Sequence, residues 1–145
     1  MKRTLALIFA FVVAGIVAIA GPATATERSG ALHVTKECSQ YNLTAGSFCT
    51  ITSSNIHTIK PGMRVVYLAA AANGVLDSNI VLSSAHGSAA FGHVRLDFTT
   101  LQGRVTFSGG TGKFTGFHAD TVVSLDSTGL WHWDGPYSFT GSDDE

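Results

Sequence analysis

The chain contains little charge, little proline and almost no cysteine. Only 13% of its 145 residues are Asp, Glu, Lys or Arg, and it has three prolines and two cysteines. Nine basic and ten acidic side chains give a formal net charge of −1. Nucleic acids and anionic membranes are recognised by clustered positive charge, so neither is expected as a partner.

Several motifs with a defined chemistry are also missing. There is no Gly-x-Ser-x-Gly nucleophile elbow, no Cys-x-x-Cys pair and no His-x-x-x-His metal spacing. The glycine-rich segment 109–112 is not followed by the Lys-Ser or Lys-Thr pair of a phosphate-binding loop. We therefore expect neither a metal nor an organic cofactor.

The N-terminal segment has the order of a secretory signal peptide. A basic start at 1–3 precedes an uncharged apolar run at 5–20, and Ala23-Thr24-Ala25 fits a cleavage site. The alternative is an uncleaved anchor, but roughly 16 apolar residues are fewer than a membrane span usually needs. We predict a signal peptide over 1–25 and a secreted, extracellular protein, with a domain at 26–141 and a disordered acidic tail at 142–145.

Both cysteines belong to the predicted exported domain. Cys38 and Cys49 would meet an oxidising environment, which favours a disulfide over a metal site or a redox pair. Because the enclosed loop is short, its stabilisation is expected to be about 2–3 kcal/mol at most.

The remaining residues predict an all-β domain. Short apolar segments alternate with Gly, Asn, Asp and Ser clusters at intervals of about 8–14 residues, which is typical of antiparallel strands. The predicted strands are 32–35, 49–52, 64–72, 75–82, 91–98, 104–108, 117–125, 131–134 and 137–140. About eight strands favour a closed antiparallel β-barrel after the signal peptide, with a sandwich as the alternative.

Turn residues separate these segments. Asn73-Gly74 fits either a helix C-cap or a type I′ hairpin turn, and the β-rich surroundings favour the hairpin. Further turns are predicted at Gln102-Gly103, at 109–112, at 126–129 and at Gly135-Pro136.

Residues 107–116 read FSGGTGKFTG and match a G-G-[ST]-G-x-F turn, and the closing segment 133–139 reads WDGPYSF. Through these two motifs the segment from Gly103 to Phe139 resembles the allene oxide cyclase and dirigent-protein barrel superfamily, in particular its small exported bacterial members. The resemblance implies an eight-stranded, often oligomeric barrel with an apolar cavity and no cofactor. It also implies either cyclisation of a fatty-acid epoxide or control of phenol coupling. The sequence departs from both patterns before the glycine turn, so no catalytic residue is carried over.

Two His/Asp pairs are candidates for chemistry. His118 with Asp120 and His132 with Asp134 each share one face of a strand, and a short turn around Ser127 would place Asp120 opposite Asp134. Such a group can serve acid–base catalysis or hold Zn²⁺ or Cu²⁺. Ordinary cross-strand polar pairs on a solvated face are the favoured alternative.

Two further sets complete the candidate site. His93, Arg95 and Asp97 alternate along one strand, either as a solvated salt-bridge row or as a strip that binds an anion such as a fatty-acid carboxylate. Trp131 and Trp133 share a face and either fill the core or line an apolar pocket that could stack a sugar ring.

These observations favour a binding protein. The barrel is expected to bind a small apolar ligand or a protein partner, and a homo-oligomer is compatible with the pattern. The alternative is a cofactor-free isomerase or cyclase. The barrel interior separates the two, because an enzyme needs a cavity reached by a carboxylate or a histidine.

Overall fold

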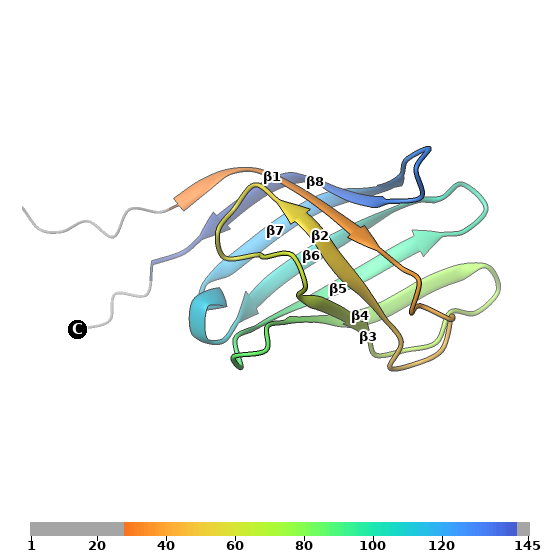
Figure 1. The fold of residues 1–145 in the computed structure, drawn as a ribbon, viewed down its shortest axis with the longest axis horizontal. Helices are drawn as coiled ribbons and strands as arrows, with labels where there is room; N and C mark the ends of the chain where they lie inside the picture. Colours follow the sequence, from red (N-terminus) through yellow and green to blue (C-terminus); the bar gives the residue numbers. More distant parts are fainter. Residues whose placement is uncertain (1–27, 142–145) are drawn as a thin grey trace, which may run out of the picture.

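A computed structural model describes residues 28–141 (Figure 1). The predicted signal peptide and acidic tail lie outside the described residues. The described elements are β1 (Arg28–Glu37), β2 (Phe48–Ser54), β3 (Arg64–Tyr67), β4 (Val75–Ser83), β5 (Ala89–Asp97), β6 (Gln102–Gly110), the 3₁₀ helix η1 (Gly112–Phe114), β7 (Phe117–Leu125) and β8 (Trp131–Phe139).

The eight strands form a closed antiparallel barrel, which confirms the predicted fold class. Each strand pairs with the next in the sequence, and β8 returns to pair with β1. This closing pair runs from Arg28 opposite Phe139 to Lys36 opposite Trp131. Closure leaves neither strand with an unpaired edge.

The hairpin at Asn73-Gly74 is confirmed. Both residues have positive φ angles, 54° and 75°, and the flanking Ala72 and Val75 exchange backbone hydrogen bonds of 2.9 and 3.0 Å. The preceding strand is shorter than predicted, because β3 ends at Tyr67 and the alanine-rich residues that follow leave the sheet.

The turn predicted at Gln102-Gly103 is wrong. Both residues open β6, and the chain turns at 98–101 instead, where Leu101 has a φ of 57°. Gly103 serves a close approach of two strands, since a Cβ there would lie 2.2 Å from the Arg95 carbonyl oxygen.

Two other glycine sites are also strand residues. The corner predicted at 109–112 begins two residues later than expected, because Gly109 and Gly110 end β6 and η1 forms the connection to β7. Gly135 lies within β8 rather than in a turn, and a Cβ there would lie 2.1 Å from the Asp120 carbonyl oxygen.

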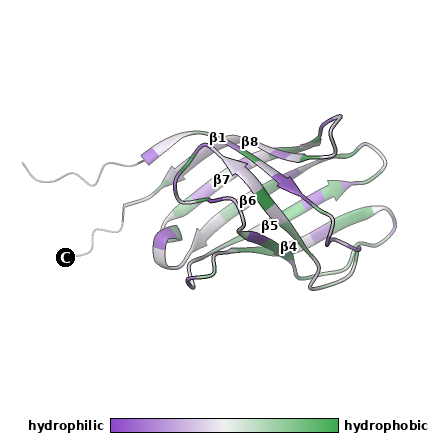
Figure 2. Cartoon of the chain, in the orientation of Figure 1, coloured by the Kyte–Doolittle hydropathy of each residue, from purple (hydrophilic) through white to green (hydrophobic). Residues whose placement is uncertain are grey.

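The apolar face of each strand lines the barrel, so the lumen holds the hydrophobic core. Figure 2 shows green apolar residues alternating with purple polar ones along the strands. Phe107 and Phe117 are both buried, with ring centroids 5.4 Å apart, and Phe117 also packs against Phe114 and Phe139.

The two ends of the barrel differ in what closes them. The loops at 38–47, 68–74, 98–101 and 126–130 gather at one end, to the right in Figure 1, opposite the ends of the described chain. Cys38 and Cys49 form the predicted disulfide at this end, which we call the disulfide end. Within residues 28–141 we find no helix of the length and apolar character that crossing a membrane requires.

Candidate functional site

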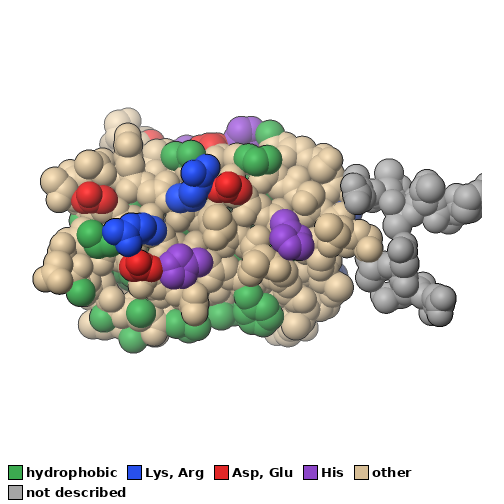
Figure 3. Space-filling view, turned by 180° about the vertical axis from the view of Figure 1, so that it is seen from behind, with side chains coloured by type: hydrophobic (Ala, Val, Ile, Leu, Met, Phe, Trp, Pro, Cys, Tyr) green, Lys and Arg blue, Asp and Glu red, His purple; other side chains and the backbone are tan. Residues whose placement is uncertain are grey.

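Most of the polar residues selected from the sequence lie on the outer wall of the barrel. His93, Arg95, Asp97, His118 and Asp120 all point away from the lumen and are exposed. Figure 3 shows Arg, Asp and His side chains gathered across this wall. The outward position follows from period-two alternation, since the residues between them are buried.

The His93 row is organised by an acidic residue that sequence reasoning missed. Asp77 on β4 lies 2.6 Å from His93 Nε2 through one carboxylate oxygen and accepts a 2.9 Å hydrogen bond from Arg95 through the other. Asn79 lies 2.9 Å from His93 Nδ1. Asp97 takes no part in this group and accepts instead from the Thr99 backbone N–H at 2.7 Å. Pairing of β4 with β5, which the connection at 84–88 joins, places Asp77 opposite Arg95 and Asn79 opposite His93.

The predicted approach of Asp120 to Asp134 is wrong. The β7–β8 connection spans 126–130 and is therefore centred on residue 128 instead of Ser127. This register places Asp134 opposite Val122. Asp120 instead accepts a 2.6 Å hydrogen bond from Arg104 Nε on β6.

The two predicted His/Asp pairs are also separated. Asp134 pairs with His33 of β1 at 2.7 Å, and His132 pairs with Asp126 at 2.6 Å. His118 Nδ1 lies 3.0 Å from the Gly116 carbonyl oxygen. The histidines and aspartates of the Zn²⁺ or Cu²⁺ alternative therefore do not converge on one point.

Two open hollows lie on the outer wall beside these residues. One, of about 290 Å³, is lined by Arg95, Asp97 and Arg104, and the other, of about 370 Å³, is lined by His118 and Asp120. The charged groups in them are already paired within the wall, apart from Asp97 and His118, which bond to the backbone.

The lumen contains a polar group that sequence reasoning did not select. Lys36 is the one charged side chain that is buried among residues 28–141. Its Nζ donates a 2.5 Å hydrogen bond to the Tyr67 hydroxyl and lies 5.1 Å from the Trp133 ring centroid. The sequence could have predicted that Lys36 is buried, because Lys36 shares its strand face with the buried Leu32 and Val34.

Two further polar atoms belong to the rings that pack beside Lys36 and Tyr67. The Tyr41 hydroxyl and Trp133 Nε1 are both buried and have no hydrogen-bond partner within the described chain. Tyr41 packs on Tyr67 with ring centroids 4.9 Å apart. The Tyr67 hydroxyl donates onward to Cys49 Sγ at 3.4 Å, which links the group to the disulfide. We call Lys36, Tyr41, Tyr67 and Trp133 the lumen polar cluster.

Burial sets the protonation of the cluster. Loss of solvation lowers the pKa of Lys36 to about 7, and Lys36 takes part in none of the ion pairs found among residues 28–141. Burial raises the pKa of Tyr67 above its usual range, and the neighbouring Tyr41 adds to that rise. At neutral pH both phenols remain protonated, whereas the amine is divided between its two forms.

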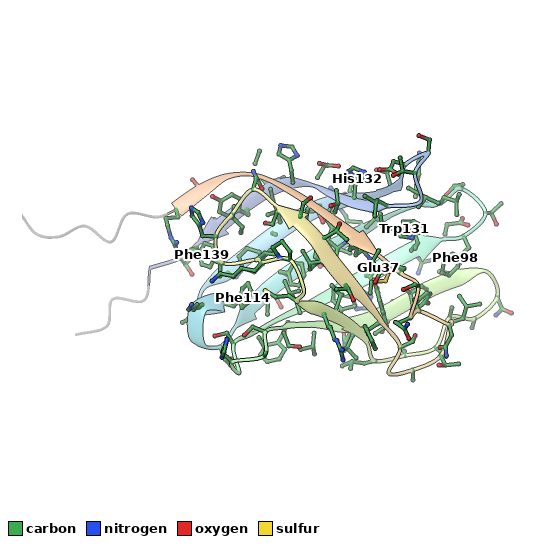
Figure 4. All side chains as sticks on the ribbon, viewed as in Figure 1. Glu37, Phe98, Phe114, Trp131, His132 and Phe139 are labelled. Atoms are coloured by element: carbon green, nitrogen blue, oxygen red, sulfur yellow. A yellow bond between two sulfur atoms is a disulfide. The ribbon has the colours of Figure 1, made fainter. Side chains whose placement is uncertain are left out.

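The disulfide end covers the cluster with aromatic and aliphatic side chains. Tyr41, Phe98 and Trp131 are partly buried and pack against the core. Figure 4 shows Phe98 and Trp131 at this end, with Phe114 and Phe139 at the other. Leu43 and Leu68 on the surrounding loops are exposed by 51% and 53%, so each adds an apolar side chain to the surface of this end.

No protein-family model and no curated protein matches the chain.

Proposed function

We propose that the chain is an exported binding protein whose barrel receives a small, largely apolar molecule at its disulfide end. The observation that carries this proposal is the lumen polar cluster, in which a buried amine has no carboxylate partner and two polar atoms have no partner at all. A buried polar group without a partner costs about 1–3 kcal/mol. Such groups are rare in native proteins and call for a role.

The chemistry of the cluster indicates the kind of ligand. Lys36, Trp133 and the tyrosine hydroxyls all present N–H or O–H groups, so the complementary ligand carries an oxygen acceptor. The ring faces of Tyr67 and Trp133, together with the exposed side chains of Leu43 and Leu68 at the same end, suit a hydrocarbon or aromatic body. A small apolar molecule with a carbonyl, carboxylate or phenol oxygen combines both features.

Export and family membership belong to the same proposal. The Cys38–Cys49 disulfide supports an oxidising, extracellular location, in agreement with the signal-peptide pattern at 1–25. The eight-stranded antiparallel barrel, with the glycine-rich corner between β6 and β7, supports membership of the allene oxide cyclase and dirigent superfamily.

Two alternatives are weaker. A protein partner could use the outer wall, where the Asp77–His93–Arg95 group is exposed, but its charges already neutralise one another. A cofactor-free isomerase or cyclase would need an acid or base in the lumen. Among residues 28–141 no Asp, Glu or His side chain is buried, so Lys36 is the one group available for that role.

Tryptophan fluorescence tests the proposal directly. The chain has two tryptophans, Trp131 and Trp133, and both lie at the disulfide end, so occupancy of this end should change their emission. We would titrate the disulfide-intact protein with cinnamic acid, benzyl alcohol and toluene. We expect saturable changes that are strongest for the oxygen-bearing probes.

Matched variants separate the lumen from the outer wall. Lys36→Met should weaken cinnamic acid binding at least tenfold, whereas Arg95→Ala on the outer wall should leave it unchanged. The opposite pattern would place the ligand on the outer wall, and no saturable response to any of the three probes would overturn the proposal.

A further inference from the structure

We propose that Lys36 binds carbonyl compounds covalently, by condensation of its ε-amine with an aldehyde or ketone to form an imine inside the barrel. This inference deepens the proposed function and rests on ligand entry at the disulfide end. It is carried by the position of the amine, which is buried, faces two aromatic rings and has no carboxylate partner.

The surroundings of Lys36 differ from those of the other lysines of the predicted exported domain. Lys60 and Lys113 are exposed to solvent, whereas Lys36 is 5% exposed. The Tyr67 hydroxyl is its hydrogen-bond partner among the described residues, and the Trp133 ring lies on another side. No negative charge therefore holds the nitrogen in its ammonium form.

The amine must be neutral to attack a carbonyl carbon. With a pKa of about 7, about half of Lys36 is free base at pH 7. An exposed lysine with an ordinary pKa has roughly one free amine in 3,000 at the same pH. At pH 7 the fraction of Lys36 in the neutral, nucleophilic amine form is therefore far larger than that of an exposed lysine. This amine lies among apolar and aromatic side chains.

The reaction is a balanced condensation that needs no oxidant or reductant. The nitrogen lone pair attacks the carbonyl carbon, and the carbon–oxygen π electrons move to oxygen, which takes a proton. The carbinolamine hydroxyl takes a second proton from solvent and leaves as water while the nitrogen lone pair forms the C=N bond, and the remaining N–H proton returns to solvent. One carbonyl and one amine therefore give one imine and one water.

Tyr67 is placed to act as the proton donor. Its hydroxyl lies 2.5 Å from Lys36 Nζ, within reach of an oxygen bonded to the carbon under attack. Because burial raises the pKa of Tyr67, the phenol is neutral at pH 7 and has a proton to give. It recovers a proton from the nitrogen, which becomes acidic after attack.

The experiment maps adducts on the native, disulfide-intact protein. The protein is incubated with benzaldehyde at pH 7, the imines are reduced with cyanoborohydride, and the modified lysines are located by peptide mass spectrometry. We expect Lys36 to be labelled at least tenfold faster than Lys60 or Lys113 in the same molecules. Its labelling rate should level off above about pH 8, while theirs continues to rise through pH 9.

Equal or slower labelling of Lys36 in the folded protein, with full labelling only in denaturant, would overturn the inference. Lys36→Arg should abolish the selective adduct, and Lys113→Arg should leave it unchanged. At saturating benzaldehyde, Tyr67→Phe should slow adduct formation about tenfold, a loss larger than any change it makes in benzyl alcohol affinity.

Benzyl alcohol also separates the two proposals, because it fits the same site and cannot form an imine. Saturable binding of benzyl alcohol without a Lys36 adduct overturns the covalent step alone. Failure of both measurements overturns the ligand-binding proposal as well.

Discussion

The Lys36 amine of β1 lies 5.1 Å from the centroid of the Trp133 ring of β8, and these two strands pair to close the barrel. A cation facing an aromatic ring gains about 0.5–2 kcal/mol. Removing an ammonium from water costs several kcal/mol, even after the protein relaxes. The ring and the single Tyr67 hydrogen bond therefore do not offset the burial of Lys36, and the residue lowers the stability of the fold at neutral pH.

Replacing this lysine should therefore stabilise the protein. Lys36→Met keeps an unbranched side chain of similar length and removes the charge, so we expect the free energy of unfolding to rise by about 1–4 kcal/mol at pH 7. Urea denaturation followed by tryptophan fluorescence measures the change. Lys113→Met, at an exposed site, should alter stability by less than about 0.5 kcal/mol. A loss of 2 kcal/mol or more in Lys36→Met would contradict this account of the lumen.

The stability of the wild-type protein should also depend on pH in a defined window. The pKa of Lys36 is lowered from 10.5 to about 7 in the folded state, so between these values the unfolded chain binds more protons. Stability therefore rises as pH increases from about 7 to 10, by up to about 5 kcal/mol if the full shift is expressed. Below pH 7 this contribution no longer changes, because Lys36 is protonated in both states.

Denaturation curves at half-unit intervals between pH 6.5 and 9.5 measure this dependence. The slope should disappear in Lys36→Met and persist in Lys113→Met. A wild-type curve that falls across the window would show that the buried amine is not the titrating group.

Period-two alternation and turn residues were sufficient to predict the barrel from the sequence. The Asn73-Gly74 hairpin is confirmed, because two adjacent positive φ angles suit few residue pairs other than Asn-Gly. Gly103 and Gly135 were assigned to turns, whereas they lie where neighbouring backbones approach closely. Sequence alone does not distinguish these two uses of glycine, since both appear as a missing side chain.

The candidate site was harder to predict from the sequence than the fold. His and Asp residues attract attention in a sequence, but their alternation with apolar residues placed most of them on the outer wall. The Lys36 position could have been found, because it continues the buried face of Leu32 and Val34. Its partners could not, since Tyr67 is 31 residues away on β3, beyond β2, and Trp133 comes beside it only when β8 closes the barrel against β1. The Asp120–Asp134 error came from placing the centre of one turn a residue too early.

The different uses of glycine predict different costs of substitution. A Cβ at Gly103 would lie 2.2 Å from the Arg95 carbonyl oxygen and 2.8 Å from the Leu96 Cα, so Gly103→Ala must push β5 and β6 apart. We expect a loss of about 3 kcal/mol, at the upper end of overpacking costs. Thr106→Ala, at an exposed position of the same strand, should cost less than about 1 kcal/mol.

A turn glycine provides the comparison. Gly129 has a φ of 87° and open space around it, so Gly129→Ala strains the backbone without a collision. Its cost should be about 1–2 kcal/mol, smaller than that of Gly103→Ala. Thermal unfolding of the variants measures the order, and an equal effect at Gly103 and Gly129 would contradict the close approach of the strands.

The turn between β7 and β8 should be sensitive to acid through Asp126. Hydrogen bonds from the Thr128 side chain and from His132 hold the pKa of Asp126 well below its usual range, with further bonds from the Leu130 and Thr128 backbone. Since the folded pKa is depressed, the stabilisation is complete above the unfolded value of 3.8 and is lost as pH falls below it. Amide exchange at Leu130, whose N–H donates to Asp126, should therefore accelerate between pH 4 and pH 2 beyond its intrinsic pH dependence.

A variant tests which group holds the Asp126 pKa down. Thr128→Ala removes the largest contribution to the lowered pKa, so the Asp126 carboxyl titration followed by NMR should move back toward 3.8, whereas Ser127→Ala should leave it in place. An unchanged titration in Thr128→Ala would show that this hydroxyl does not organise the turn at the mouth of the disulfide end.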